Sequence, residues 1–509
     1  MESRNFLGPG GLSADEARDL LRKAVDVGLT FKYRQNFANQ PDPAALDAIA
    51  TEQLPADGQP LDDLLDSMES DYLKHMPNFA APSFAGFPDA GNSAAGTAGA
   101  VLAELVNVNM INAAFCSRGA TEMEIALIRW LRQLIGYSVD EAAPASAFDV
   151  GGIPTGGGTM ANFAAVLLAR GRAIPNVREQ GLQSASGKLR VLLPEHIGHY
   201  TIGASLAWSG LGLDSVLYAP VSDYRYDLTA LHQVLAGARD RGEQVIMAVA
   251  YAGDSRTMTI DNLTAIAEIV RSHFPRAWLH CDGCHGTSLL FSEAQRGRLD
   301  GLTEFDSVMM DPHKVLAVPY TNSFVLLRDP AEAAVISTES ELILRQARSL
   351  GQITPATGSR AFQSLRTWML IKAMGVSGIG EMIDRRIDNA RKFAEIIDET
   401  PGLVRLNDVS INSVMFTLDP SMRGAPFDED NAQRSSAVTE NVYQEILKDG
   451  FAYLHSFRIA DTGNRLGLGR AHVHPALRFM SGNALLRVED MHEIVQHCLN
   501  LGKRVEVLA

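Results

Sequence analysis

The stretch Ser-Val-Met-Met-Asp-Pro-His-Lys at residues 307–314 is the most informative part of this chain. Its opening run is apolar and strand-like, so Lys314 would lie at a strand end, beside the crevice where α/β sheets hold ligands. A lysine in such a cleft is partly desolvated, which favours a neutral, nucleophilic amine suited to a Schiff base with an aldehyde cofactor. Taken alone, the stretch is equally well explained by a surface lysine after a turn.

A glycine-rich segment precedes a helix-like run at residues 163–170. It reads Gly-Gly-Ile-Pro-Thr-Gly-Gly-Gly-Thr-Met-Ala-Asn at residues 151–162. Glycines let the backbone approach an anion closely, and a helix N-terminus adds free N–H groups and a positive dipole end. Thr159 adds a hydroxyl donor. The segment is typical of a phosphate cradle, although glycine-rich turns before helices are common and it matches neither GxGxxG nor a Walker loop.

The stretch Trp-Leu-His-Cys-Asp-Gly-Cys-His-Gly at residues 278–286 begins as a buried strand. Strand alternation places His280, Asp282 and Cys284 on one face, and Cys281 and His285 on the other. An aspartate at this strand end could pair with a protonated pyridine nitrogen. The alternation also separates the cysteines and histidines, and no second ligand pair lies nearby, which argues against a zinc site.

A histidine motif lies in the sequence between the glycine-rich segment and the stretch that contains Asp282. Residues 195–201 read Glu-His-Ile-Gly-His-Tyr-Thr and follow a strand-like run at residues 189–193. A histidine at this point could stack on a planar cofactor and move protons. A single histidine is more often structural, but the position of His199 between the phosphate cradle and Asp282 favours a functional role.

Together the four motifs resemble those of pyridoxal-phosphate-dependent decarboxylases of the group that includes aromatic amino-acid and glutamate decarboxylases. The likeness covers most of the chain, from about residue 75 to about residue 495. It implies that Lys314 carries the cofactor, that Asp282 holds the pyridine nitrogen and that His199 stacks over the ring. Further cofactor contacts implied by the resemblance are Gly158, Thr159, Ser255 and His313.

The resemblance also implies weaker candidates for a substrate pocket. Phe84 and Phe87 belong to a turn-rich segment at residues 82–92, and Arg360 precedes a long helix. For the two phenylalanines, ordinary packing is an equal alternative. Asp89 in the same segment could meet a cationic substrate group, but a solvated turn aspartate is the favoured interpretation.

Strand-like and helix-like runs alternate between residues 111 and 385, which predicts a mostly parallel sheet with helices on both faces. The resemblance implies the aspartate-aminotransferase-like α/β fold, known as fold type I. Its expected parts are an N-terminal helical segment (1–110), a large cofactor-binding domain (111–385) and a small C-terminal α/β domain (386–509). It also implies a homodimer, with active sites at the interface.

The activity implied by the resemblance is decarboxylation of an L-amino acid. The substrate would displace Lys314 as an external aldimine, and loss of the carboxylate would give a quinonoid on a ring that Asp282 keeps protonated. Family members usually carry a tyrosine on a loop after the lysine. No tyrosine occurs here between Tyr320 and Tyr443.

The stretch that corresponds to this loop spans residues 331–354, and the expected position falls among Ser337, Thr338, Glu339, Ser340 and Glu341. Members without the tyrosine resemble aldehyde synthases. Decarboxylation-dependent oxidative deamination is therefore a close alternative, and another lyase reaction such as Cβ–S elimination also stays open.

The composition agrees with a globular metabolic enzyme. A net charge of −15 disfavours nucleic acid and anionic membranes as partners. Four cysteines in 509 residues indicate reduced thiols and a cytoplasmic location. The N-terminus lacks a signal-peptide pattern, and no apolar run reaches the ~18 residues of a membrane span.

Overall fold

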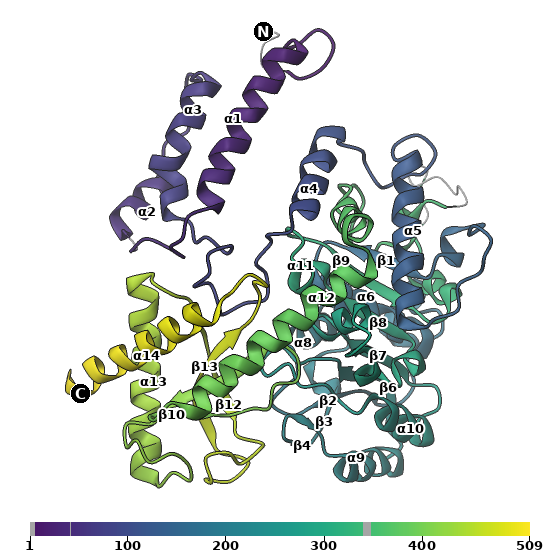
Figure 1. The fold of residues 1–509 in the computed structure, drawn as a ribbon. Helices are drawn as coiled ribbons and strands as arrows, with labels where there is room; N and C mark the ends of the chain where they lie inside the picture. Colours follow the sequence, from purple (N-terminus) through teal and green to yellow (C-terminus); the bar gives the residue numbers. More distant parts are fainter. Residues whose placement is uncertain (1–5, 41, 339, 341–347, 509) are drawn as a thin grey trace.

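A seven-stranded sheet forms the centre of the computed structural model, which describes residues 6–40, 42–338, 340 and 348–508 (Figure 1). The strand order is β1-β9-β8-β7-β6-β2-β3. β9 is antiparallel to its neighbours β1 and β8, and the other neighbouring pairs are parallel. The strands are β1 (Gly152–Thr155), β2 (Leu189–Pro194), β3 (Val216–Ala219), β6 (Gln244–Tyr251), β7 (Trp278–Asp282), β8 (Ser307–Met310) and β9 (Ser323–Leu327).

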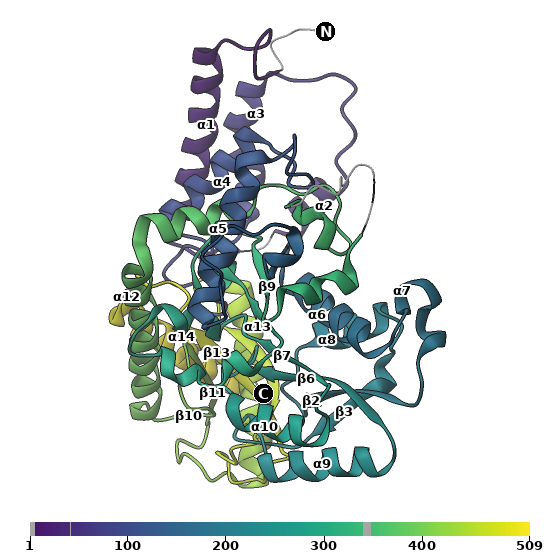
Figure 2. The ribbon, with the colours of Figure 1, turned by 90° about the vertical axis from the view of Figure 1, so that its right-hand side faces the viewer.

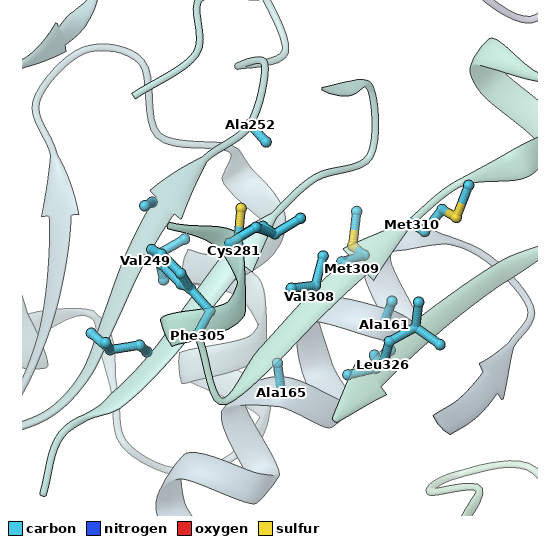
Figure 3. Packing of buried hydrophobic residues seen from close by; sticks show 14 of the residues in the cluster. Ala161, Ala165, Val249, Ala252, Cys281, Phe305, Val308, Met309, Met310 and Leu326 are labelled. Carbon is cyan, nitrogen blue, oxygen red and sulfur yellow. The ribbon is translucent and has the colours of Figure 1, made fainter. Parts of the chain in front are cut away.

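Helices between the strands cover this sheet, as the alternating pattern predicts. They include α6 (Gly158–Ala173), α8 (Tyr200–Trp208), α9 (Leu228–Asp240) and α10 (Leu263–His273), and α5 (Arg118–Ile135) precedes the first strand. α6 packs closely on the strands because its inner face carries small residues. Ala161 and Ala165 join Val308 and Leu326 in one hydrophobic core (Figure 3). This packing confirms the predicted α/β class and fixes α6 against the strand ends.

A second, four-stranded antiparallel sheet forms the small C-terminal domain, in the order β10-β11-β13-β12. Its elements are β10 (Leu403–Arg405), β11 (Ser413–Leu418), α13 (Glu429–Asp449), β12 (His455–Ala460), β13 (Val473–Met480) and α14 (Val488–Leu508). The core of this domain includes Phe393 stacked on Phe479, with ring centroids 3.7 Å apart.

The long helix α12 (Ser364–Glu399) runs from the large domain into the small one (Figure 1). It is kinked at Gly375, where φ is 64°. In its first half, Thr367 donates a hydrogen bond to the side chain of Asn322 at 2.5 Å. In its second half, the guanidinium of Arg386 donates to the carbonyl of Val315. α12 therefore holds the segment that follows Lys314 from two sides, and the domain boundary proposed at residue 385 lies inside it.

The N-terminal helices α1 (Ala14–Lys32), α2 (Pro43–Ala50) and α3 (Leu61–Ser67) project away from the two domains (Figures 1 and 2). None of these three helices contains a buried residue. The segment at residues 82–92 instead joins the small domain: Ala85 N–H donates to the carbonyl of Tyr453 at 2.9 Å, and Met480 N–H donates to Ala85 at 2.6 Å. No helix in the described part of the chain is both long and apolar enough to cross a membrane.

Candidate active site

Lys314 lies on the short helix α11 (Pro312–Val315), directly after the carboxyl end of β8. Its Nζ is 3.0 Å from Oδ2 of the fully buried Asp311. Burial lowers the pKa of this amine, but Cys284 and three carboxylates, Asp311, Asp282 and Asp89, outweigh burial and hold that pKa well above its usual value. The prediction of a neutral amine is therefore wrong for the protein without cofactor. Desolvation favours the neutral amine as predicted, but the neighbouring groups favour the charged amine more strongly.

Asp282 is the last residue of β7 and is 1% exposed. Its Oδ2 accepts a hydrogen bond from Nδ2 of Asn162 at 3.0 Å, and its Oδ1 accepts one from the backbone N–H of Cys284 at 3.3 Å. Burial alone would raise the pKa of this carboxyl, but His199, Lys314 and the amide of Asn162 bring it below its usual value. Asp282 is therefore a buried carboxylate anion at the strand end.

His199 caps the N-terminus of α8. Its Nδ1 is 2.6 Å from the hydroxyl of Thr201, and its backbone N–H donates to the hydroxyl of Tyr251 at 2.9 Å. Burial lowers the pKa of the imidazole, which keeps the ring neutral near neutral pH. The charge of Asp282 acts on this pKa, as does that of Lys314, so the structure brings the three predicted groups together.

The predicted phosphate cradle forms the N-terminus of α6, which begins at Gly158. A Cβ built on Gly156 or Gly157 would meet no described atom within 4 Å, so the space in front of this turn is open. A Cβ on Gly158 would lie 2.7 Å from Oδ2 of Asp311, and only glycine allows that approach. Thr159 is the second helical residue, where its N–H has no partner within the helix. The open turn and free N–H groups suit an anion.

The remaining predicted cofactor contacts lie near the same strand ends. His313 hydrogen-bonds through Nδ1 to the carbonyl of Asn322 at 2.8 Å, and its ring is tilted against Tyr320 at 5.2 Å between centroids. Ser255 lies in the turn after β6, where its carbonyl accepts a hydrogen bond from Arg478 at 2.6 Å. A cofactor contact by His313 or by the hydroxyl of Ser255 stays a prediction.

The two candidate phenylalanines occupy different environments. Phe84 is 3% exposed and stacks on Phe79 at 4.2 Å and on Tyr453 at 5.6 Å between ring centroids. Phe87 is only partly buried, and the guanidinium of Arg478 lies 5.4 Å from its ring centroid. Phe87 also stacks on Tyr453, at 5.9 Å between ring centroids. The two rings therefore share one aromatic cluster, but Phe84 is buried in it, whereas Phe87 is only partly buried and also contacts Arg478. The pocket role of each stays a prediction.

Arg360 pairs with a buried carboxylate. Both terminal nitrogens of its guanidinium donate to Glu124, one of them at 2.8 Å, and Glu124 is 1% exposed. Ser364 donates to the same carboxylate at 2.7 Å. Arg360 also lines a cavity of about 410 Å³ beside Thr155 and Gly156 of the glycine-rich turn. A substrate contact by Arg360 stays a prediction.

Asp89 is not the solvated turn residue that the sequence favours. It is 7% exposed, and burial raises the pKa of its carboxyl, opposed by the charges of Lys314 and His313. The cause is the path of the chain: Ser93 N–H donates to the carbonyl of Ala317 at 3.0 Å, which holds the end of this segment against the lysine segment.

The comparisons with known proteins agree with this geometry. The chain matches the family described as the pyridoxal-dependent decarboxylase conserved domain over residues 43–419. This chain belongs to that family. It is 29% identical to an L-2,4-diaminobutyrate decarboxylase of Acinetobacter baumannii over 70% of this chain and 69% of that protein. It is 23% identical to an aromatic-L-amino-acid decarboxylase of Bacillus atrophaeus over 97% of each chain.

Among solved structures, mouse CSAD in its apo form has the same fold. The TM-score is 0.85 at 23% sequence identity, covering 96% of this chain and 99% of the mouse chain. The predicted family and fold are therefore confirmed. The chain is a pyridoxal-phosphate-dependent carboxy-lyase of fold type I, with pyridoxal 5′-phosphate as its cofactor.

The residues of this chain fit that cofactor. The open glycine turn at the N-terminus of α6 suits a phosphate, the buried carboxylate of Asp282 suits a protonated pyridine nitrogen, and the amine of Lys314 suits an aldehyde carbon. Within the described residues, no cluster of three or more histidine, cysteine or acidic side chains could hold a metal ion.

Sequence reasoning missed two buried cationic or basic groups of the site. Arg478 is 2% exposed, donates to the carbonyls of Ser255 and Gly86, and lies between the rings of Phe87 and Phe457. Burial lowers the pKa of Arg478 to about 10, so it stays charged. An arginine inside the apolar run of residues 476–480 was the available signal.

His285 is the second missed group. It is 3% exposed, and its Nδ1 has no hydrogen-bond partner among the described residues. Burial, followed by the charge of Lys314, holds the pKa of the imidazole well below its usual value. His285 is therefore a neutral side chain close to the lysine.

Proposed function

We propose that this protein decarboxylates an L-amino acid to an amine and carbon dioxide. The observation that supports this most directly is the grouping of a charged Lys314, an ionised Asp282 and a neutral His199 around the carboxyl ends of β2, β7 and β8. The relatives named above, which share the family, act on a diamino acid and on aromatic amino acids by their names.

Each residue has a distinct task in this reaction. Bound pyridoxal phosphate supplies the electron sink. Asp282 holds a negative charge where the pyridine nitrogen must stay protonated, and Asn162 fixes the direction of that carboxylate. Lys314 would hold the aldehyde carbon of the cofactor, and its free amine would be placed to move a proton. His199 provides a flat, neutral surface, and Asp282 is fully buried, whereas Lys314 and His199 are only partly exposed and so face the space that the cofactor would fill.

Oxidative deamination after decarboxylation is the second candidate function. The observation that favours it is the lack of tyrosine between residues 320 and 443. Of the residues where the loop tyrosine is expected, 337, 338 and 340 are described by the structure, whereas 339 and 341 lie outside the described residues. In this reaction, the amino acid, oxygen and water yield an aldehyde, carbon dioxide, ammonia and hydrogen peroxide in equal amounts.

Simultaneous measurement of carbon dioxide release and oxygen uptake separates the two functions. The purified holoenzyme would be supplied with acidic, aromatic and diamino acids. Carbon dioxide with an amine and no oxygen uptake would support simple decarboxylation. Carbon dioxide with equal oxygen uptake and ammonia would support oxidative deamination. Absence of carbon dioxide release with every amino acid would contradict both.

We also propose that the active protein is a homodimer. The helix α4 (Ala94–Val106) exposes four large apolar side chains that the described residues do not cover: Val101, Leu102, Leu105 and Val106. A face of this kind on a free monomer would be unfavourable in water. Light scattering on the purified protein should give twice the mass of the chain, and a mass equal to one chain would contradict the dimer.

A further inference from the structure

A continuous row of buried polar side chains leads from the interior of the central sheet to the catalytic site. Nε1 of Trp278 lies 2.7 Å from Oγ of Ser307, and that Oγ lies 2.8 Å from Nδ1 of His280. Nε2 of His280 lies 3.0 Å from Oδ1 of Asn162. The four residues come from β7, β8 and α6, and none is more than 1% exposed.

The chemistry of the donors fixes the direction of this row. An indole N–H can only donate, so the hydroxyl oxygen of Ser307 accepts from Trp278. The carboxylate of Asp282 can only accept, so Nδ2 of Asn162 faces it and Oδ1 of Asn162 faces Nε2 of His280, which must carry a proton. Burial lowers the pKa of His280 to about 4, so Nδ1 carries no proton and accepts from the hydroxyl of Ser307, and the ring N–H is at Nε2. That N–H donates to Oδ1 of Asn162, which fixes the orientation of the Asn162 amide.

Beyond Asn162 the row divides toward both catalytic groups. Its Nδ2 donates to Oδ2 of Asp282 at 3.0 Å and to Oγ1 of Thr201 at 2.8 Å. The hydroxyl of Thr201, having accepted that hydrogen bond, donates its own hydrogen to Nδ1 of His199 at 2.6 Å. The backbone N–H of Thr201 points to the same nitrogen at 3.3 Å. Nδ1 of His199 therefore has two donors, and the proton of the ring must be on Nε2.

We propose that Asn162 and Thr201 are positioning residues that set the tautomer of His199 and the orientation of Asp282 together. His280, Ser307 and Trp278 impose the direction of the hydrogen bonds from inside the sheet. The proposal rests on the proposed function for what His199 and Asp282 do, but the hydrogen-bond row itself belongs to the protein alone. The row couples His199 and Asp282, because the side-chain amide of Asn162 donates both to Thr201, which contacts His199, and to Asp282.

Histidine-selective ¹⁵N NMR of the full-length protein without cofactor tests this proposal directly. In the wild type, we expect His199 as the Nε2–H tautomer across neutral pH. Thr201→Val has nearly the same shape but no hydroxyl, so we expect both tautomers of His199 in this variant. Thr201→Ser keeps the hydroxyl and should restore the single tautomer. A His199 tautomer that is the same in the wild type and in Thr201→Val would overturn the proposal.

Asn162→Leu tests the shared step, because leucine approximates the shape of asparagine. In the holoenzyme, we expect kcat to fall about tenfold or more while KM changes little, and we expect a larger loss than in Thr201→Val because Asp282 is affected as well. The control is Tyr226→Phe, which removes another buried hydrogen bond of the large domain, from Tyr226 to the carbonyl of Val249 at 2.8 Å.

A merely structural role would give a different pattern of results. Asn162→Leu and Tyr226→Phe would then lower thermal stability by similar amounts, and both variants would keep the wild-type His199 tautomer and the wild-type kcat. That result would refute the proposal. If Asn162→Leu does not fold, Thr201→Val with its serine rescue still decides the question. An unchanged His199 tautomer in Thr201→Val would contradict the role of the buried hydrogen-bond row. A wild-type protein that releases no carbon dioxide would contradict only the proposed function.

Discussion

The cofactor side and the substrate side of this site are built in different ways. On the cofactor side, Lys314, Asp282 and His199 each lie within a few residues of a strand end of the central sheet. On the side where the substrate pocket is predicted, called the substrate side below, Phe87 and Asp89 lie on an irregular segment held by the small domain and the lysine segment. The backbone hydrogen bonds of the sheet fix the positions of the strand ends. The substrate side is positioned instead by contacts among segments that are far apart in the sequence. Substitutions on the cofactor side should therefore affect chemistry, and those on the substrate side should often affect stability first.

The largest expected effect is that of Lys314→Ala. Without the amine, no covalent link to the cofactor can form, and we expect carbon dioxide release to fall at least about a thousandfold. The visible absorbance of the Schiff base should vanish, while the exposed control Lys392→Ala keeps both that absorbance and its turnover. Retention of the visible band would contradict the assignment of Lys314.

Asp282→Asn should follow, with a loss of at least about a hundredfold in kcat, because the ring nitrogen loses the anion that keeps it protonated. Steady-state kinetics would measure this, with the exposed Asp300→Asn as control. Near-normal turnover in Asp282→Asn would show that the cofactor side is not organised as described.

Arg360→Gln sharpens the comparison on the other side. Breaking a buried ion pair leaves Glu124 without its partner, so we expect a loss of about 3 kcal/mol in the free energy of unfolding. Glu124→Gln should cost a similar amount. Denaturant unfolding and KM would be measured for both variants. A rise in KM in Arg360→Gln alone, at unchanged stability, would instead place Arg360 on the substrate.

Acid should destabilise the two sheets alike. Burial lowers the pKa of His280 in the central sheet and of His474 in the small domain to about 4. A depressed pKa means that the folded state binds fewer protons than the unfolded state, so this stability is complete above about pH 6.5 and is lost as pH falls toward 4. Each histidine accounts for up to about 3 kcal/mol. Melting temperatures between pH 7.5 and 4.5 would check this, and a constant value would contradict it.

The smallest expected effect separates the two phenylalanines. Phe84→Leu should lower the free energy of unfolding by about 1 to 2 kcal/mol, because the ring stacks within a buried aromatic cluster. Phe87→Leu should cost less, since its ring is only partly buried, and should change KM if it lines the substrate pocket. Equal stability losses and unchanged KM in both variants would remove Phe87 from the pocket.

The sequence predicts the cofactor side of the site better than the substrate side. The apolar runs that end at Asp282 and before Lys314 predicted both strands and both side chains, because strand position and chemistry coincide within a few residues. The role of Asn162 was not predictable, since its partners come from two other elements, β7 and α8, and the relevant signal is a hydrogen-bond direction. The burial of Asp89 was missed because its turn-like surroundings say nothing about the segments that cover it. The charge of Lys314 was misjudged because the groups around it, Cys284 and then Asp311, had not been weighed against desolvation.

One helix has a practical consequence for anyone who wishes to divide this protein. α12 contacts the segment after Lys314 both before and after its kink, through Thr367 to the side chain of Asn322 and through Arg386 to the carbonyl of Val315. A truncation at residue 385, which would look like a clean separation of two domains, removes Arg386 and with it a buried donor to the carbonyl next to the lysine. The two parts should therefore be expressed, labelled and evolved as one unit.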